Sequence, residues 1–202
     1  MEPAITPYFQ TTQFTCGPCS LMRLMQKLCP DYTPTLRDEL EIWRASNTVF
    51  MGEDQAGCNI YGLACAALQR GFLPEIFVSE NSDTIFNHTL ENDHERTCLL
   101  TAQAIDKEHA QRHHIPITIE RPSKNLLTRL AQEDRAILVL INDGEVGHWV
   151  VCDKITEQEV LLFDPYEPTE FSDENGLFHV SWQKFLRLSQ INGETAFLSL
   201  TT

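Results

Sequence analysis

The sequence predicts an α+β fold, in which a mainly helical part (residues 1–135) is followed by a mainly β part (residues 136–202). In the first part, apolar residues recur every three or four positions, as they do in helices that bury one face. In the second part, short apolar runs alternate with polar turns, which is typical of buried strands. Helices that precede strands, rather than alternate with them, indicate α+β. The length suits a single domain over residues 1–202.

Three helices are expected in the first part. The first follows the segment Cys16-Gly-Pro-Cys19 and stops before Pro30. The second begins at Thr35, which opens a segment that resembles a capping box. The third covers residues 59–69. The apolar residues that share one face of the second helix are Leu36, Leu40 and Trp43.

Five apolar runs of strand length are expected to form the sheet. They are residues 73–79, 136–142, 148–155, 160–163 and 196–200. The polar stretch 156–159 joins the third run to the fourth, which predicts a β-hairpin. Residues 83–114 are expected to be mostly helical and polar.

Composition argues against several kinds of partner. The net charge is −14, and such an acidic chain lacks the clustered Lys and Arg that hold nucleic acid phosphates. No window approaches ~18 uninterrupted apolar residues, so neither a transmembrane helix nor a membrane partner is expected. The seven cysteines are odd in number and scattered, and no secretory signal is visible. Reduced thiols in the cytoplasm are therefore expected.

Cys16 is the first candidate for chemistry. It lies where an extended segment becomes a helix, so free backbone N–H groups and the helix dipole favour negative charge there. A thiol in such a position can be a thiolate at neutral pH. The alternative is a small buried residue at a helix start.

The predicted hairpin brings a histidine near a carboxylate. His148 opens the third run and Asp164 ends the fourth, and the two are about equally far from the turn. They should therefore lie opposite or diagonal to each other on adjacent strands. A carboxylate that accepts from one imidazole nitrogen holds the ring in one tautomer and makes it a better base. Gln10, six residues before Cys16, is a candidate oxyanion donor together with the Cys16 N–H, and Gln13 is a nearby competitor.

Three segments together resemble a papain-like cysteine peptidase. They are Gln10-Thr-Thr-Gln-Phe-Thr-Cys16-Gly-Pro18, Gly147-His148-Trp-Val-Val151 and Phe163-Asp164-Pro165. The most similar type is the bacteriocin-processing peptidase, which cleaves double-glycine leaders, with its stand-alone bacterial relatives. Residues 39–72 resemble the stand-alone relatives more than the transporter-fused enzymes. No transporter region follows in this sequence, so a double-glycine leader is not the expected substrate.

The resemblance implies a papain-like fold, with the helical part that carries Cys16 packed against an antiparallel sheet that carries His148 and Asp164. It implies Cys16 as nucleophile, His148 as general base and acid, Asp164 as the group that orients His148, and Gln10 as oxyanion donor. Such a hydrolase forms a covalent acyl-enzyme with a peptide or protein substrate, and it needs neither a metal nor an organic cofactor.

Other functions stay open on the residues alone. The same groups can pass an acyl group to an amine, as in acyltransferases of the phytochelatin-synthase type, and a silent peptide-binding module can keep the fold. Cys16-Gly-Pro-Cys19 is also the motif of thiol–disulfide oxidoreductases, where it follows a strand of a βαβ unit. His109 and His113 share a helix face but lack the Glu of a zinc-peptidase helix, so a solvated face is expected.

An acidic stretch surrounds and follows Asp164. Residues 155–183 contain no Lys or Arg. Their acidic residues are Glu157, Glu159, Asp164, Glu167, Glu170, Asp173 and Glu174. This stretch is expected to border the site and to favour cationic substrates or a free amino terminus, with a solvated acidic loop as the alternative.

Overall fold

The structure is a computed structural model. It describes residues 6–47, 57–82, 85, 93–142, 144, 147–166, 168 and 172–202. The helices in these ranges are α1 (Cys16–Leu28), α2 (Leu36–Ser46), α3 (Ile60–Leu68), α4 (Asp93–Arg112), α5 (Lys124–Gln132) and α6 (Trp182–Leu188). The strands are β1 (Leu73–Val78), β2 (Ile117–Ile119), β3 (Ala136–Asn142), β4 (Gly147–Ile155), β5 (Glu159–Phe163), β6 (Leu177–Ser181) and β7 (Ala196–Thr201).

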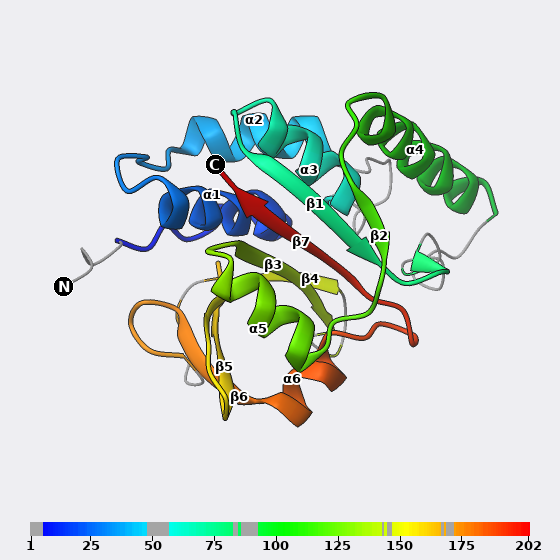
Figure 1. The fold of residues 1–202 in the computed structure, drawn as a ribbon. Helices are drawn as coiled ribbons and strands as arrows, with labels where there is room; N and C mark the ends of the chain where they lie inside the picture. The colour runs from blue at the N-terminus through cyan, green and yellow to red at the C-terminus, as the bar shows by residue number, and fades with distance from the viewer. Residues whose placement is uncertain are drawn as a thin grey trace.

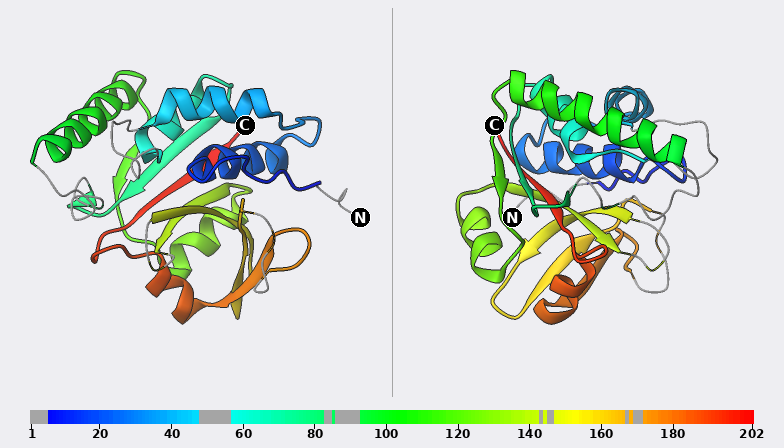
Figure 2. Two further views of the ribbon diagram at one scale, coloured as in Figure 1. Left: turned by 180° about the vertical axis from the view of Figure 1, so that it is seen from behind. Right: turned by 90° about the vertical axis from the view of Figure 1, so that its right-hand side faces the viewer.

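The strands form one curved sheet with helices on both of its faces (Figures 1 and 2). Their order is β2-β1-β7-β3-β4-β5-β6. Helices α1 and α3 pack on one face, with α2 and α4 outside them, and α5 and α6 cover the other face. The α+β class is therefore confirmed, and the helix that carries Cys16 does pack against the sheet that carries His148.

The sheet draws strands from both predicted parts of the chain. Strands β1 and β2 belong to the mainly helical part, yet they extend the same sheet, because β7 returns between β1 and β3 and pairs with both. The sheet is also not wholly antiparallel, since β1 and β2 run parallel. Parallel neighbours need a long crossover, which the segment containing α4 supplies.

The predicted helices and strands are confirmed within one or two residues at each end, apart from the first helix, which begins four residues earlier, at the first residue of Cys16-Gly-Pro-Cys19. The polar segment 83–114 contains α4, and its residues 83–84 and 86–92 lie outside the described part. Four short elements were not predicted, namely β2, α5, β6 and α6. Each is only three to nine residues long, too short for a clear period.

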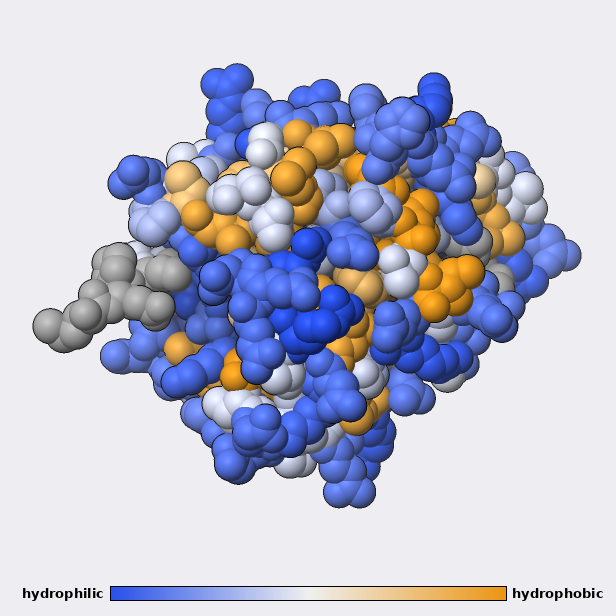
Figure 3. Space-filling view, viewed as in Figure 1, coloured by the Kyte–Doolittle hydropathy of each residue, from blue (hydrophilic) through white to orange (hydrophobic). Residues whose placement is uncertain are grey.

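Helix α2 begins as predicted, but of its predicted face only Trp43 packs against the core, where it is half-buried. Thr35 and Asp38 form the capping box in both directions. Leu36 and Leu40 are 51% and 38% exposed, and the buried residues of α2 are Glu39, Ile42 and Ser46. The reason is that α2 lies against both α1 and α3, and the face they cover carries a glutamate. Apolar side chains accordingly remain visible on the surface, and Figure 3 shows such patches in the half of the molecule where α2, α3 and β1 lie.

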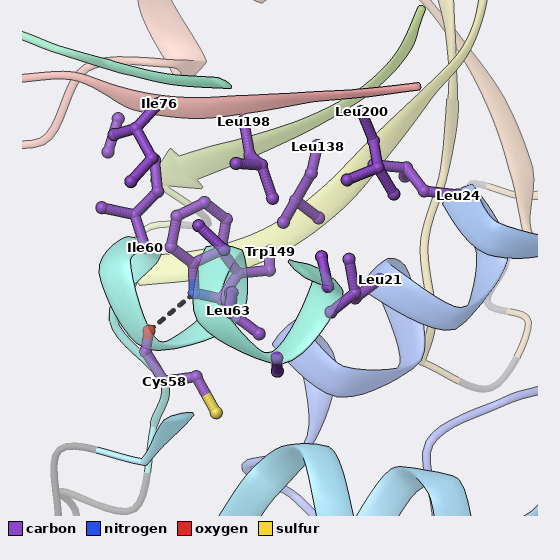
Figure 4. Packing of buried hydrophobic residues seen from close by; sticks show 14 of the residues in the cluster. Leu21, Leu24, Cys58, Ile60, Leu63, Ile76, Leu138, Trp149, Leu198 and Leu200 are labelled. Atoms are coloured by element: carbon purple, nitrogen blue, oxygen red, sulfur yellow. Dashed lines mark hydrogen bonds between the residues drawn. The ribbon is translucent and has the colours of Figure 1, made fainter. Parts of the chain in front are cut away.

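Two apolar clusters, one on each face of the sheet, hold the layers together. The larger one is built around Trp149 of β4, which is 2% exposed and contacts residues of α1 and α3 (Figure 4). Its indole Nε1 donates to the Cys58 carbonyl at 2.9 Å, so its polar atom is satisfied. Gly17 adds to this contact, because a Cβ there would come within 3.2 Å of the Trp149 ring. The first turn of α1 is therefore seated directly on β4.

Within the described ranges, none of the helices has the length and hydrophobicity that a bilayer crossing would need.

Candidate active site

Cys16 is the first residue of α1 and is 7% exposed. Thr15 is the N-cap, but its side chain makes no capping hydrogen bond, and no acidic residue occupies the first turn. The N–H groups at a helix start have no partner within the helix, and the dipole is positive there. The Cys16 sulfur therefore lies where the backbone stabilises a negative charge.

Helix α1 is fixed to strand β4 by polar contacts along its length. The Ser20 hydroxyl donates to the Trp149 carbonyl at 2.9 Å. One turn further, Arg23 donates from Nε and Nη2 to Asp153 Oδ1, at 3.1 and 2.9 Å. The register of β4 against β5 shifts between Cys152 and Lys154, so Asp153 sits in a bulge. Bulges redirect side chains, and this one gives α1 its anchor.

His148 and Asp164 lie at the other end of the β4–β5 pair. Val151 pairs with Phe163, so Asp164 lies opposite Val150. His148 is therefore the diagonal neighbour of Asp164. His148 Nε2 and Asp164 Oδ1 are 2.8 Å apart, so the hydrogen bond expected from the hairpin is present. Asp164 Oδ1 also accepts from the Tyr166 N–H at 2.8 Å, which fixes the carboxylate.

Cys16 lies on the other side of the imidazole of His148, close enough to raise its pKa. Asp164 occupies Nε2, which leaves Nδ1 for the sulfur. Burial lowers the pKa of His148, but the hydrogen bond to Asp164 and the nearby Cys16 outweigh burial and raise that pKa from 6.5 to about 10. Burial raises the pKa of Asp164, and the hydrogen bond from His148 more than reverses this, so its pKa is lowered. The geometry thus favours an imidazolium held between a carboxylate and a sulfur.

Gln10 lies beside this group. Its backbone N–H donates to the Pro165 carbonyl at 2.7 Å, directly after Asp164. Its side-chain Nε2 donates to the Thr12 carbonyl at 2.7 Å. An amide NH₂ carries two donors, so the second N–H is left for another acceptor. The predicted competitor, Gln13, is exposed.

Cys19 lies one helical turn after Cys16 and is 1% exposed. Burial and the nearby Glu39 carboxylate both raise the pKa of its thiol. The ten described residues before Cys16 contain no strand, so the βαβ context of the redox motif is missing there. Cys19 is therefore a buried thiol whose raised pKa keeps it protonated.

The other singled-out residues lie away from this group. His109 on α4 and His113 just after its end are both exposed, as expected for a solvated face. No set of three or more His, Cys, Asp or Glu residues suited to a metal ion occurs in the described part of the chain. Of the expected core thiols, Cys58, Cys65 and Cys152 are buried, whereas Cys98 is only half-buried on α4.

The acidic stretch is split between two ends of β5, which corrects the expectation that all of it borders the site. Glu157 and Glu159 lie at the turn end, where Lys124 and His179 pair with them at 2.8 and 2.7 Å. Asp173 lies at the Asp164 end, in a turn whose Gly176 carbonyl accepts from the Asp164 N–H at 2.9 Å. Glu167 and Glu170 lie outside the described residues.

The model of the Peptidase_C39 like family matches residues 6–196. No curated protein matches the sequence significantly. Among solved structures, the peptidase domain of Streptococcus mutans ComA aligns with 98% of this chain and 100% of its own, at 14% identity and a TM-score of 0.44. The peptidase domain of Streptococcus ComA, described as a bi-functional ABC transporter involved in a quorum sensing pathway, aligns over 96% and 97%, at 13% identity and a TM-score of 0.49.

Proposed function

We propose that this chain, which belongs to the Peptidase_C39 like family, is a cysteine peptidase whose nucleophile is Cys16. The observation that carries the proposal is one imidazole with two neighbours. His148 hydrogen-bonds Asp164, and Cys16, at the start of a helix, lies close enough to raise the pKa of the same imidazole. A nucleophile, a base and a group that orients the base, each within hydrogen-bond reach of the next, is the arrangement that covalent acyl transfer needs.

The proposed reaction uses only side chains and the backbone of this chain. Cys16 attacks the carbonyl carbon of a peptide as a thiolate, and the carbonyl oxygen becomes an oxyanion. The Cys16 N–H and the free N–H of Gln10 Nε2 stabilise that oxyanion. His148 then protonates the leaving amine, and an acyl-enzyme forms on sulfur. Water, deprotonated by His148, attacks the acyl group and releases the acid.

Separate contacts support the proposed roles of Asp164 and Gln10. Asp164 holds the His148 ring through Nε2, which leaves Nδ1 available to Cys16. Gln10 is tied by its backbone to Pro165, which supports its role beside the same group. We also propose that the protein works in the cytoplasm, because its seven cysteines are all unpaired.

A peptide library tests the proposal. The purified protein is incubated with a tryptic library of a bacterial proteome, and new amino termini are identified by mass spectrometry. Cys16→Ala is the matched control. We expect new termini with the wild type and none with Cys16→Ala, and equal termini in both samples would refute the assignment of Cys16.

The same assay separates the alternatives. An added amine such as glycine amide captures the acyl group if the enzyme is a transferase, and the product is then an amide rather than an acid. Iodoacetamide at pH 6 should alkylate Cys16 ahead of the buried Cys19, because a thiolate reacts and a thiol does not. No cleavage together with an unreactive Cys16 would indicate a peptide-binding module instead.

A further inference from the structure

Glu39 of α2 is a carboxylate with no exposed surface. Glutamates are almost never fully buried unless other groups satisfy them, because an unpartnered charge is costly in the interior. Glu39 lies on the inward face of α2, as does the buried Ile42. Leu36 and Leu40 of the same helix are exposed. The proposed reaction does not use it, so its burial needs another explanation.

The partners of Glu39 all come from one segment, residues 8–19. Oε1 accepts from the Thr11 N–H at 2.8 Å and from the Thr15 hydroxyl at 2.5 Å. Oε2 accepts from the Tyr8 hydroxyl at 2.8 Å and from the Thr11 hydroxyl at 3.1 Å. The Cys19 thiol lies close enough for the carboxylate to raise its pKa. A single side chain therefore gathers the whole segment that leads into α1.

Two of these partners are neighbours of the proposed machinery. Thr11 follows Gln10, and Thr15 precedes Cys16. Thr15 is the N-cap of α1, and its hydroxyl donates to Glu39 instead of capping the helix. The segment is fixed at a second point, because Gln10 donates its N–H to the Pro165 carbonyl.

We infer that Glu39 is a positioning residue that sets the distance between Cys16, Gln10 and the imidazole of His148. The inference rests on the proposed function and adds to it. Helix α2 acts as the rigid support, the carboxylate holds Thr11 and Thr15, and these hold the oxyanion donor and the nucleophile. A misplacement of about 1 Å in such a site costs on the order of 10²-fold in rate. Ground-state peptide binding does not depend on this distance.

The first test compares two substitutions at buried positions of α2, each of which changes the volume of the side chain only slightly. Glu39→Gln keeps an oxygen acceptor but removes the charge, and Ile42→Val creates a small defect at the next buried position. Both should lower the melting temperature by a few degrees. Only Glu39→Gln should lower kcat, by about 10- to 100-fold, with KM within about twofold of the wild type. Exposed Glu41→Gln controls for charge on the same helix and should leave kcat unchanged.

The second test keeps the Glu39 carboxylate and removes its hydrogen bond with Thr15. Thr15→Val deletes the hydroxyl at nearly constant volume, and Thr15→Ser restores it. We expect kcat to fall in Thr15→Val by about tenfold and to recover largely in Thr15→Ser. This pair also decides the matter if Glu39→Gln does not fold.

The third measurement does not need peptidase activity. The His148 imidazole is titrated by nitrogen-15 NMR, with His148→Ala to assign its signal. A displaced Cys16 no longer raises the pKa of His148, so the midpoint should fall in both Glu39→Gln and Thr15→Val. If the wild type cleaves no peptide, the proposed function fails, and this titration still decides the role of Glu39. Wild-type kcat and wild-type titration in both variants, with only the melting temperature lowered, would show that Glu39 is merely structural.

Discussion

Strand β5 has a histidine–carboxylate pair at each end, and the two pairs differ in their surroundings. At one end, His148 and Asp164 are 2.8 Å apart, with side chains 13% and 29% exposed. At the other end, His179 and Glu159 are 2.7 Å apart, but 64% and 41% exposed. Cys16 raises the pKa of the inner histidine, whereas the outer pair lies beside a turn. We therefore propose the inner pair as the catalytic one because of its burial and the nearby thiol, and not because of its distance.

The largest expected effect separates the two histidines. His148→Ala should lower kcat/KM by about 10²- to 10⁴-fold, because a positioned acid–base group contributes that much. His179→Ala removes a histidine from the same kind of pair and should change kcat/KM by less than twofold, because exposed pairs contribute little. Both are measured on one peptide identified from the library. Comparable losses in the two variants would contradict the assignment of His148.

The pH dependence of kcat/KM should distinguish the two carboxylates, Asp164 and Glu159. Asp164 raises the pKa of His148 toward about 10, so activity that needs the imidazolium is present below that pH and is lost above it. Asp164→Asn removes the charge, and we expect the alkaline limb of kcat/KM to move down by about 1–3 pH units. The maximum rate should also fall, by about tenfold or more, because the ring is less well held.

Glu159→Gln is the matched variant at the outer end of β5, and it should leave the alkaline limb in place. The pH profile of kcat/KM is recorded from pH 6 to 11, and circular dichroism checks that both variants are folded over this range. An unshifted limb in Asp164→Asn would mean that another group sets the alkaline pKa.

These pairs also indicate how much of the site could be predicted from sequence. His148 and Asp164 could be predicted together because a polar stretch between two apolar runs defines a hairpin, and a hairpin defines which residues face each other. The bulge at Asp153 could not be predicted, since nothing in the local sequence separates a bulged residue from a paired one. The bulge shifts the register by one residue, and the diagonal contact survives it.

Glu39 illustrates the opposite case. The apolar face of α2 predicts burial of Leu36 and Leu40, and by that rule Glu39 belongs to the solvated side. The structure reverses this, because four hydrogen-bond donors from residues 8–15 satisfy the carboxylate inside. Such a partnership depends on how a loop lies across a helix, and helical periodicity does not contain that information. The short elements β6 and α6 were missed for a simpler reason, their length.

The two cysteines of the Cys16-Gly-Pro-Cys19 segment extend the comparison to the nucleophile. Cys16 raises the pKa of His148, whereas Glu39 raises the pKa of the Cys19 thiol. Cys19→Ala should therefore keep hydrolysis within about tenfold of the wild type, while Cys16→Ala abolishes it. The cavity left by Cys19→Ala should lower the free energy of unfolding by about 1–2 kcal/mol, measured by urea denaturation. Equal loss in both cysteine variants, with His148→Ala still active, would favour a disulfide oxidoreductase.

The smallest effect concerns charge at the two ends of β5. Asp173 accepts from the Asn175 and Leu177 N–H groups, in the turn that contacts Asp164. Asp173→Asn keeps those acceptors and removes only a charge near the site. We expect the ratio of turnover between Lys-rich and Glu-rich peptides to fall by about twofold at low salt, and the difference to vanish as the Debye length shortens to ~8 Å at 0.15 M. Glu157→Gln, at the outer end and paired with Lys124, should leave the ratio unchanged. Equal turnover of the two peptides by the wild type at low salt would remove the preference for cationic substrates, and the acidic residues after Asp164 would then serve only as a solvated turn.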